Sequence, residues 1–157
     1  MKILAVDDDE TILDLLSEAL ALKGHERLAR ARSAHEALGI IAATTAPFDC
    51  LLLDIQMPGM DGIALCREIR NLPGYQHTPI LMLTAMSQRD YIERAFMAGA
   101  TDYITKPFDL EEVLVLVKRA IDSHIKNLRK KLRTTGPDGH DWIRSVYGVG
   151  FALDLGV

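Results

Sequence analysis

Four acidic residues stand where two apolar runs end. Asp7, Asp8 and Asp9 follow the first apolar run of the chain, and Asp54 closes the run at residues 51–53. Carboxylates at the ends of buried parallel strands converge at one edge of the sheet, where open α/β folds place their ligands. Because clustered negative charges repel one another, this arrangement favours a hard cation such as Mg²⁺ among the oxygens.

Two further polar residues close later apolar runs. Thr84 follows residues 80–83, and Lys106 follows residues 103–105. Acids, a hydroxyl and an ammonium at successive strand ends are the residue types that handle a phosphoryl group. The sequence therefore indicates a phosphoryl site at the edge of a parallel sheet.

The elements that must position these residues are βα units. Up to about residue 120, short apolar runs alternate five times with amphipathic stretches, a pattern typical of a parallel sheet. Ser33 and Glu36 fit a capping box, and Asp9 and Asp61 are expected to cap helices. Right-handed crossovers then bring all the strand ends to one edge. Strands are predicted at 2–7, 26–30, 49–53, 79–83 and 102–104, and helices at 10–22, 33–43, 61–71, 88–98 and 110–132.

The fifth predicted helix has no stop signal. Neither Pro nor Gly interrupts residues 110–132, and one apolar stripe runs along the whole segment. A helix of about 25 residues would be roughly 37 Å long, more than a small sheet can cover. Its second half is therefore expected to project or to find another partner. After a turn-rich break at 134–139, two apolar stretches flank Gly148-Val149-Gly150 and predict a hairpin over 142–154.

Composition divides the chain of 157 residues into an acidic body and a basic end. Residues 1–117 carry 10 Lys and Arg against 18 Asp and Glu, whereas residues 118–157 carry 8 against 4. The length suits one domain with a small appendage. No apolar stretch approaches the roughly 20 residues of a membrane helix, so a soluble cytoplasmic protein is expected. Cys50 and Cys66 have no metal-type spacing and are expected to be small buried hydrophobes.

Four motifs over residues 1–120 follow one another in a known order and spacing: ILAVDDDE, LLLDIQMPGMDG, PILMLTA and GATDYITKPF. In these motifs the chain resembles the receiver domain of bacterial two-component response regulators. The resemblance implies a doubly wound, flavodoxin/CheY-like α/β fold with a five-stranded parallel sheet in the order 2-1-3-4-5. It also implies a sensor histidine kinase or phosphotransfer protein as partner, Mg²⁺ as cofactor, and no enzymatic activity beyond phosphotransfer to the chain itself and autodephosphorylation.

The resemblance also implies individual roles. Asp54 corresponds to the phosphoacceptor and, with Asp8 and the backbone carbonyl of Gln56, to a direct Mg²⁺ ligand, while Asp7 acts mostly through water. Thr84 and Lys106 correspond to the pair that contacts the phosphoryl group, Ala85 to the small residue beside it, and Tyr103 to the aromatic switch residue. In the family the bond that matches Lys106-Pro107 is cis.

Two later segments, RAIDSHIKNLRKKL and WIRSVYGVGFAL, resemble the recognition helix and wing hairpin of an OmpR/PhoB-type winged-helix domain. The leading sheet and first two helices of that domain are absent. We therefore expect a receiver at 1–120 and a truncated tail at 121–157, with a recognition-like helix at 121–133 and the hairpin at 142–154. Candidate DNA contacts are His124, Lys126, Arg129, Lys130, Lys131, Arg133 and Arg144. The alternative is that these charges form only the solvated face of an amphipathic helix.

Self-association also stays open. OmpR/PhoB receivers dimerise through charge pairs across the fourth helix, fifth strand and fifth helix, but Ile92 and Leu116 stand where basic partners are expected. Asp102 and Glu112 are then unpaired by that scheme. We therefore expect no standard dimer of that kind, and a homodimer through the same elements or through the extended helix stays open as an alternative.

Two other functions compete with a phosphoacceptor. Asp7, Asp9 and Thr11 fit the DxDxT pattern of haloacid-dehalogenase-like phosphatases, in which Asp7 would be the nucleophile of a turnover enzyme. That class needs an acidic pair after Lys106 and a cap insertion, and it leaves Asp54 without a role. The second alternative is a transcriptional regulator that acts through the basic tail.

Overall fold

Five parallel strands form the central sheet in the order β2-β1-β3-β4-β5, as predicted. The computed structural model describes residues 1–24, 28–85, 89–135, 143–146 and 150–153. The strands are β1 (Ile3–Val6), β2 (Leu28–Ala31), β3 (Cys50–Asp54), β4 (Ile80–Thr84) and β5 (Asp102–Thr105). The helices are α1 (Glu10–Leu22), α2 (Ala34–Ala42), α3 (Gly62–Arg70), α4 (Arg89–Met97) and α5 (Leu110–Thr135).

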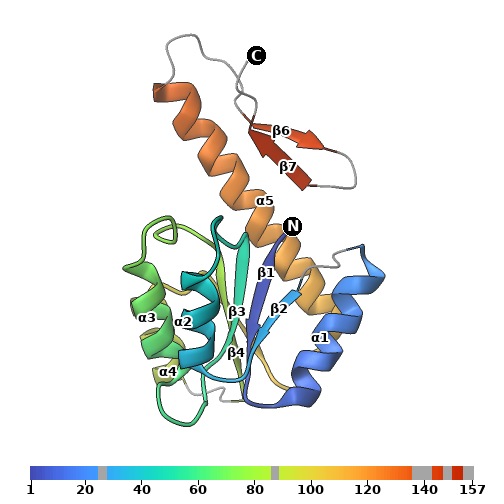
Figure 1. Ribbon diagram of the computed structural model, residues 1–157, viewed down its shortest axis with the longest axis vertical. Helices are drawn as coiled ribbons and strands as arrows, with labels where there is room; N and C mark the ends of the chain where they lie inside the picture. The colour runs from blue at the N-terminus through green and yellow to red at the C-terminus, as the bar shows by residue number, and fades with distance from the viewer. Residues whose placement is uncertain (25–27, 86–88, 136–142, 147–149, 154–157) are drawn as a thin grey trace.

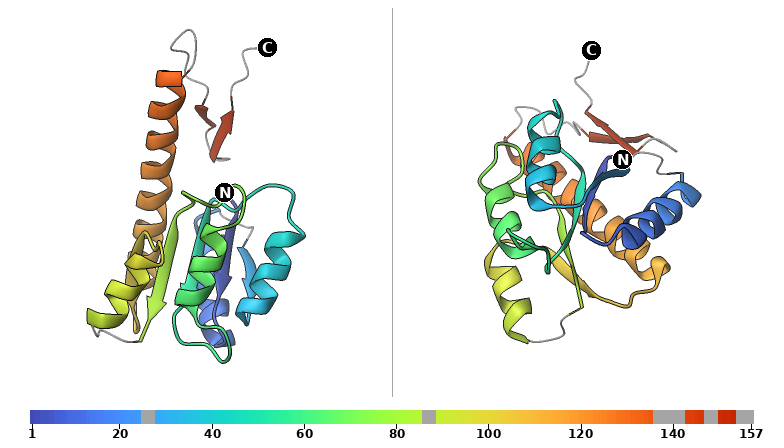
Figure 2. Two further views of the ribbon diagram at one scale, coloured as in Figure 1. Left: turned by 90° about the vertical axis from the view of Figure 1, so that its left-hand side faces the viewer. Right: turned by 60° about the horizontal axis from the view of Figure 1, so that its bottom comes forward.

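Helices cover both faces of the sheet, α1 and α5 on one side and α2, α3 and α4 on the other (Figures 1 and 2). Alternation along β1 explains the two layers, since Leu4 and Val6 belong to one hydrophobic cluster and Ile3 and Ala5 to the other. All four residues are at most 1% exposed. Strands buried on both faces read as continuous apolar runs, which is the pattern that identified them.

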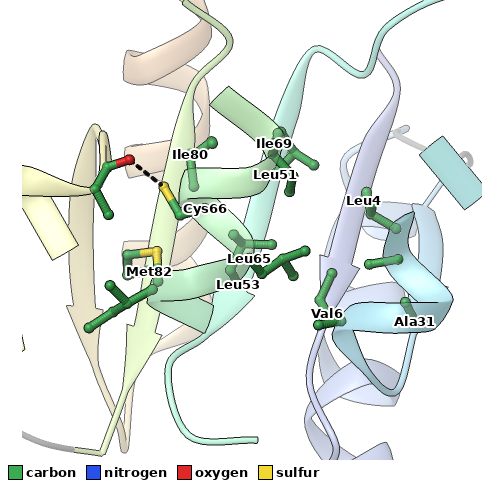
Figure 3. Packing of buried hydrophobic residues seen from close by; sticks show 14 of the residues in the cluster. Leu4, Val6, Ala31, Leu51, Leu53, Leu65, Cys66, Ile69, Ile80 and Met82 are labelled. Atoms are coloured by element: carbon green, nitrogen blue, oxygen red, sulfur yellow. Dashed lines mark hydrogen bonds between the residues drawn. The ribbon is translucent and has the colours of Figure 1, made fainter. Parts of the chain in front are cut away.

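The core beneath α3 is built from aliphatic side chains of the central strands. Figure 3 shows Leu51, Leu53 and Met82 of the sheet packing against Leu65 and Ile69 of α3. Cys66 lies in the same cluster, and its thiol donates a weak hydrogen bond to the carbonyl of Ala98 at 3.6 Å. Cys50 is also buried, and both cysteines are free thiols, as the sequence predicted. Burial raises the pKa of the Cys50 thiol to about 12, so it behaves as an apolar side chain.

The register of the strands aligns their carboxyl ends. Val6 lies opposite Leu53, so that Asp7, one residue further, is level with Asp54. Asp54 in turn lies opposite Leu83, and Thr84 lies opposite Thr105. The pairing of the strands therefore brings the two acids and the hydroxyl to one edge, one residue before Lys106 follows β5.

Caps position the helices that follow those strand ends. The Asp9 carboxylate accepts from the Thr11 amide at 2.9 Å, and the Asp61 carboxylate accepts from the Ala64 amide at 2.8 Å. Both predicted caps are confirmed. Ser33 caps α2 as predicted, but the Glu36 carboxylate accepts from the backbone N–H of Arg32 rather than of Ser33, so the capping box is shifted by one residue.

The spacing of apolar residues at 10–22 predicts a buried stripe of Ile12, Leu15, Leu16, Ala19 and Leu20, and the structure differs at one position. Leu13 and Leu16 are 1% exposed, whereas Leu15 is 40% exposed. Residues three and four apart share a helix face, so that Leu13, Leu16 and Leu20 line up against the sheet and α5. Leu15 is turned away from that line.

Helix α5 is 26 residues long and continues past the sheet at the end where the strands begin (Figure 1). Val113, Val117 and Ile121 are buried, and Ile125 packs partly on the same cluster. Beyond Ile121 no α5 side chain up to residue 132 is fully buried. The prediction of a single, projecting fifth helix is confirmed.

The C-terminal segment contains two short strands, β6 (Ile143–Val146) and β7 (Gly150–Leu153), which pair antiparallel. They fall within the hairpin predicted at 142–154. Residues 142, 147–149 and 154 of that prediction lie outside the described residues, as do the first two residues of the predicted second strand and the first residue of the predicted fourth helix. None of the described helices is long and apolar enough to cross a membrane.

Candidate metal and phosphoryl site

Three carboxylates meet at the carboxyl edge of the sheet. Oxygen atoms of Asp7, Asp8 and Asp54 all lie within 4.8 Å of one another. Asp7 and Asp54 are 0% and 4% exposed, while Asp8 is open to solvent. The buried pair sits at the base of the cluster, and the exposed carboxylate is at its mouth.

Lys106 closes the cluster from the loop after β5. Its Nζ donates to Asp7 Oδ2 at 2.6 Å and lies 3.3 Å from Asp54 Oδ1. The second oxygen of Asp7 accepts from the Asp9 amide at 2.9 Å, so both oxygens of Asp7 are engaged. The Lys106-Pro107 bond is cis, as the family resemblance implied.

Among the three carboxyl groups of the cluster, Asp54 is the one whose pKa is clearly raised. Burial, followed by the negative charge of Asp7, raises the pKa of the Asp54 carboxyl to about 7, although the Lys106 ammonium acts in the opposite direction. Burial alone would lower the pKa of Lys106, but its hydrogen bond to Asp7 and the charges of Asp54 and Asp7 outweigh burial and raise it. One ammonium therefore does not neutralise the acids completely, and a further cation is favoured among these oxygens.

The other predicted site residues lie on β4 and β5 and on the loops that follow β3 and β4. Thr84 is the last residue of β4 and is fully buried, and Ala85 after it is exposed. Gln56, two residues beyond Asp54, is exposed. Tyr103 packs partly on the core beneath α4, with its ring 6.1 Å from that of Phe96 in an edge-to-face arrangement.

Gly62 is a contributor that motif reading did not single out. A Cβ at this position would lie 2.0 Å from the backbone oxygen of Asp54 and 2.9 Å from the Cα of Ile55. The Gly62 amide donates to the Ile55 carbonyl at 2.9 Å, which ties the start of α3 to the end of β3. The sequence signal was present as the Asp61-Gly62 pair after the Asp54 loop, because close backbone approach is a common reason for glycine.

The predicted basic face of α5 is partly paired with acids. Arg119 lies 3.4 Å from the Asp102 carboxylate, and Lys118 lies 3.0 Å from Asp122. Asp102, which the dimer scheme left unpaired, has this partner within the chain. Of the candidate DNA contacts, Lys126, Lys130 and Lys131 are exposed and His124 and Arg129 are half-buried, whereas the side chains of Arg133 and Arg144 lie outside the described part.

A doubly wound sheet with an acid triad and a lysine at its carboxyl edge defines a class of α/β signalling proteins that hold a metal-ion site there. Residues 3–118 match the family described as response regulator receiver domain. The chain belongs to this family, which is a signalling class and not one of turnover enzymes. The family match and the capping role of Asp9 overturn the haloacid-dehalogenase alternative.

Residues 111–153 match a second family, described as transcriptional regulatory protein, C terminal, over part of its DNA-binding domain. This match begins within the receiver match. The two similarities therefore overlap on α5, as expected for a chain with no linker between them.

Individual relatives agree with the receiver assignment. The chain is 36% identical over 144 residues to the regulatory protein AtoC of Escherichia coli, covering 88% of this chain and 30% of AtoC. It is 37% identical over 138 residues to the response regulator MprA of Mycobacterium leprae, covering 88% of this chain and 54% of MprA. The chain thus spans under a third of the first relative and about half of the second.

Among solved structures, a CheY-like response regulator receiver domain protein from Methanospirillum hungatei superposes with a TM-score of 0.73 at 30% identity. The match covers 80% of this chain and 97% of that one. The agreement is therefore with a whole receiver domain.

Proposed function

We propose that this chain is a phosphoacceptor of a two-component phosphorelay and that Asp54 receives the phosphoryl group. The observation that carries the proposal is the placement of Asp54. Its carboxylate is nearly buried in a cluster with two other acids, at the edge of the sheet where β4 ends in Thr84 and where Lys106 follows β5. Family membership supports the same role for the carboxylate at this position.

Asp7, Asp8, Asp54 and the backbone carbonyl of Gln56 are the groups proposed to hold Mg²⁺. The donor set fits, because Mg²⁺ prefers carboxylate and carbonyl oxygens and the three carboxylates already lie within 4.8 Å of one another. When bound, Mg²⁺ would neutralise the oxygens of the transferring phosphoryl group.

In the proposed reaction an oxygen of Asp54 forms a bond to phosphorus while the P–N bond of a phosphohistidine breaks. The electron pair of that bond goes to the imidazole nitrogen, and Asp54 becomes an acyl phosphate. Lys106 is already 3.3 Å from the reacting carboxylate and can move its charge to the phosphoryl oxygens. Exposed Ala85 leaves the approach beside Thr84 open.

The proposed output is a two-state switch. A phosphoryl group on Asp54 presents new acceptors near the Thr84 hydroxyl, and drawing that hydroxyl inward shifts the loop after β4. Tyr103 is then the aromatic side chain that would follow, since its ring packs on Phe96 of α4 and on the same core. Inverting a 1:99 equilibrium takes about 5.5 kcal/mol of differential stabilisation.

The proposed partner is a sensor histidine kinase or a phosphotransfer protein, which is the general donor for receiver domains. Exchange with an ATP-dependent kinase would place the chain in the cytoplasm. We assign residues 1–120 to the receiver and 121–157 to a truncated tail, with a recognition-like helix at 121–133. A homodimer through α4, β5 and α5, or through the extension of α5, is part of the same proposal.

DNA binding by the tail is the second candidate function. It is favoured by the match of residues 111–153 to the C-terminal family of transcriptional regulators and by the exposed lysines of α5. Such contacts would be to phosphates, so affinity would fall steeply with salt. A titration with duplex DNA at several salt concentrations tests it, and absence of binding at low salt rejects it.

The phosphoacceptor assignment is tested with acetyl phosphate and Mg²⁺ on the full chain, followed by intact mass and by size measurement. One added phosphoryl group is expected on the wild type and on Asp9→Asn, the matched control at an exposed cap. None is expected on Asp54→Ala. Phosphorylation that persists in Asp54→Ala would reject the assignment.

A further inference from the structure

A second charged site lies at the opposite end of the sheet from the acids. A cavity of about 470 Å³ opens between α5 and the loop that joins α3 to β4. Among the described residues that line it, five of six carry a nitrogen donor and one is apolar. The lining residues are His77, His124, Asn127, Leu128, Lys130 and Lys131.

Two distant segments form this pocket. His77 comes from the loop before β4, and the other residues come from the part of α5 that has passed the sheet. Figure 2 shows that extension leaving at the end where the strands begin, whereas Asp54 lies at the end where they finish. The pocket therefore exists only because α5 does not stop at the sheet.

The loop that carries His77 is held in place. The Arg70 guanidinium donates to the carbonyls of Tyr75 and Thr78, both at 2.7 Å, on either side of His77. It also donates to the Gly99 carbonyl through two nitrogens, at 2.9 and 2.7 Å. His77 is thus presented by an anchored loop, so little ordering is required when a ligand binds.

The electrostatics around the pocket favour an anion. Burial lowers the pKa of His124, and the charges of His77, Lys131 and Arg70 lower it further, while Asp49 opposes them. Asp49 already accepts a hydrogen bond from the Lys2 amide at 2.6 Å. Among the described residues, three positively charged groups and one negatively charged group act on His124, a balance that favours an anion in the cavity.

We propose that this pocket binds a phosphate group, held between the His77 loop and the lysines of α5. Lysine ammoniums and imidazole N–H groups are suitable donors for phosphate oxygens. The phosphates of a DNA backbone and those of a small phosphorylated molecule share this chemistry. The site is independent of phosphotransfer at Asp54, because none of its residues belongs to the acid cluster.

The test is a titration of the full chain with inorganic phosphate, with EDTA present and ionic strength held constant with chloride, followed by NMR of the histidine side chains. Saturable shifts are expected at His77 and His124. Affinity should fall about tenfold in Lys131→Ala and in His77→Ala, as expected for losing one charged hydrogen bond. Asp54→Ala should bind as the wild type does, which separates this site from the phosphoacceptor.

The matched control is Lys126→Ala, which removes the same charge from the same helix but does not line the cavity. Its affinity should change by less than about twofold. Equal losses in Lys126→Ala and Lys131→Ala, undiminished binding in His77→Ala, or no saturable shift would each overturn the proposal. A duplex DNA that competes with phosphate and is weakened by Lys131→Ala identifies a backbone phosphate as ligand, and a duplex that does neither excludes the DNA backbone and leaves a small phosphorylated molecule as the source.

Discussion

The acid edge, formed by Asp7, Asp8, Asp54 and Lys106, and the basic extension, which is the part of α5 beyond Ile121, lie at opposite ends of one sheet. They differ in how the chain brings their charged residues together. At the acid edge, Asp7, Asp54 and Lys106 come from segments up to 99 residues apart and are brought together by strand register. Along the extension, the basic residues are neighbours on a single helix and are mostly exposed. Charges that converge from several elements lose solvent and act on one another, whereas charges strung along a helix remain hydrated.

The largest expected effect that tests this difference is the dependence of stability on the titration of Asp54. A carboxyl whose pKa is raised to about 7 in the folded chain holds its proton more tightly than in the unfolded chain. Its contribution to stability is therefore present below about pH 4 and is lost as pH rises through 7. Asp54→Asn should raise the free energy of unfolding at pH 8 by up to about 4 kcal/mol in metal-free buffer.

Urea unfolding between pH 4 and 8 in EDTA measures this effect. Asp54→Asn should flatten the fall in stability with pH, and Asp9→Asn, at an exposed cap, should keep the wild-type profile. If Asp54→Asn retained the wild-type dependence on pH, the acid edge would not be under the repulsion described.

The next effect concerns the backbone beneath the acids. Gly62→Ala forces a Cβ onto the Asp54 carbonyl and should destabilise the fold by about 3 kcal/mol, since backbone rather than a side chain must move. Gly39→Ala is the control, because a Cβ there meets nothing within 4 Å inside α2. It should stabilise by about 0.5 to 1 kcal/mol. Equal results for the two variants in urea unfolding would contradict the close approach at Gly62.

A smaller effect, the stabilisation of the fold by Mg²⁺, distinguishes the roles of the adjacent residues Asp8 and Asp9. At a Mg²⁺ concentration ten times its dissociation constant, binding should stabilise the wild type by about 1.4 kcal/mol. Asp8→Asn should lose most of that gain, and Asp9→Asn should keep it, because only Asp8 joins the carboxylate cluster. Thermal unfolding with and without Mg²⁺ measures this stabilisation. If both variants lost it, the ion would be attracted by the total negative charge of the region and not by specific ligands.

The smallest effect is expected on α5. Arg119→Ala removes an exposed ion pair with Asp102 at 3.4 Å and should cost less than about 0.5 kcal/mol. The result should equal that of Lys126→Ala within the error of urea unfolding. A cost above about 1 kcal/mol would show that charges on this helix are coupled to the fold as those at the acid edge are.

The sequence was sufficient for the sheet and for the membership of the acid cluster, because both depend on apolar runs and on the polar residues that end them. It was less informative about side-chain direction. Leu15 and Leu13 are equally apolar, and only the packing of α1 on α5 and the sheet decides that Leu13 is buried. The pairing of Asp102 with Arg119, 17 residues away, depends in the same way on how β5 meets α5.

The basic pocket could not be predicted for a related reason. His77 and His124 each stand in an ordinary polar context, and nothing in their local sequence links a loop before β4 with the end of α5. Motifs report chemistry that recurs in a family at fixed spacing. A pocket created by the length of one helix leaves no such pattern.

Because α5 is one continuous helix, its length from the sheet also determines the direction in which its last basic side chains point. Each residue of an α-helix turns the next by about 100° and advances it by about 1.5 Å. Inserting one residue after Ile121 would therefore swing Lys130 and Lys131 about a quarter of the way around the helix, away from His77, whereas a flexible linker would absorb the same insertion. In this chain the direction of the basic face is set by counting residues from the sheet.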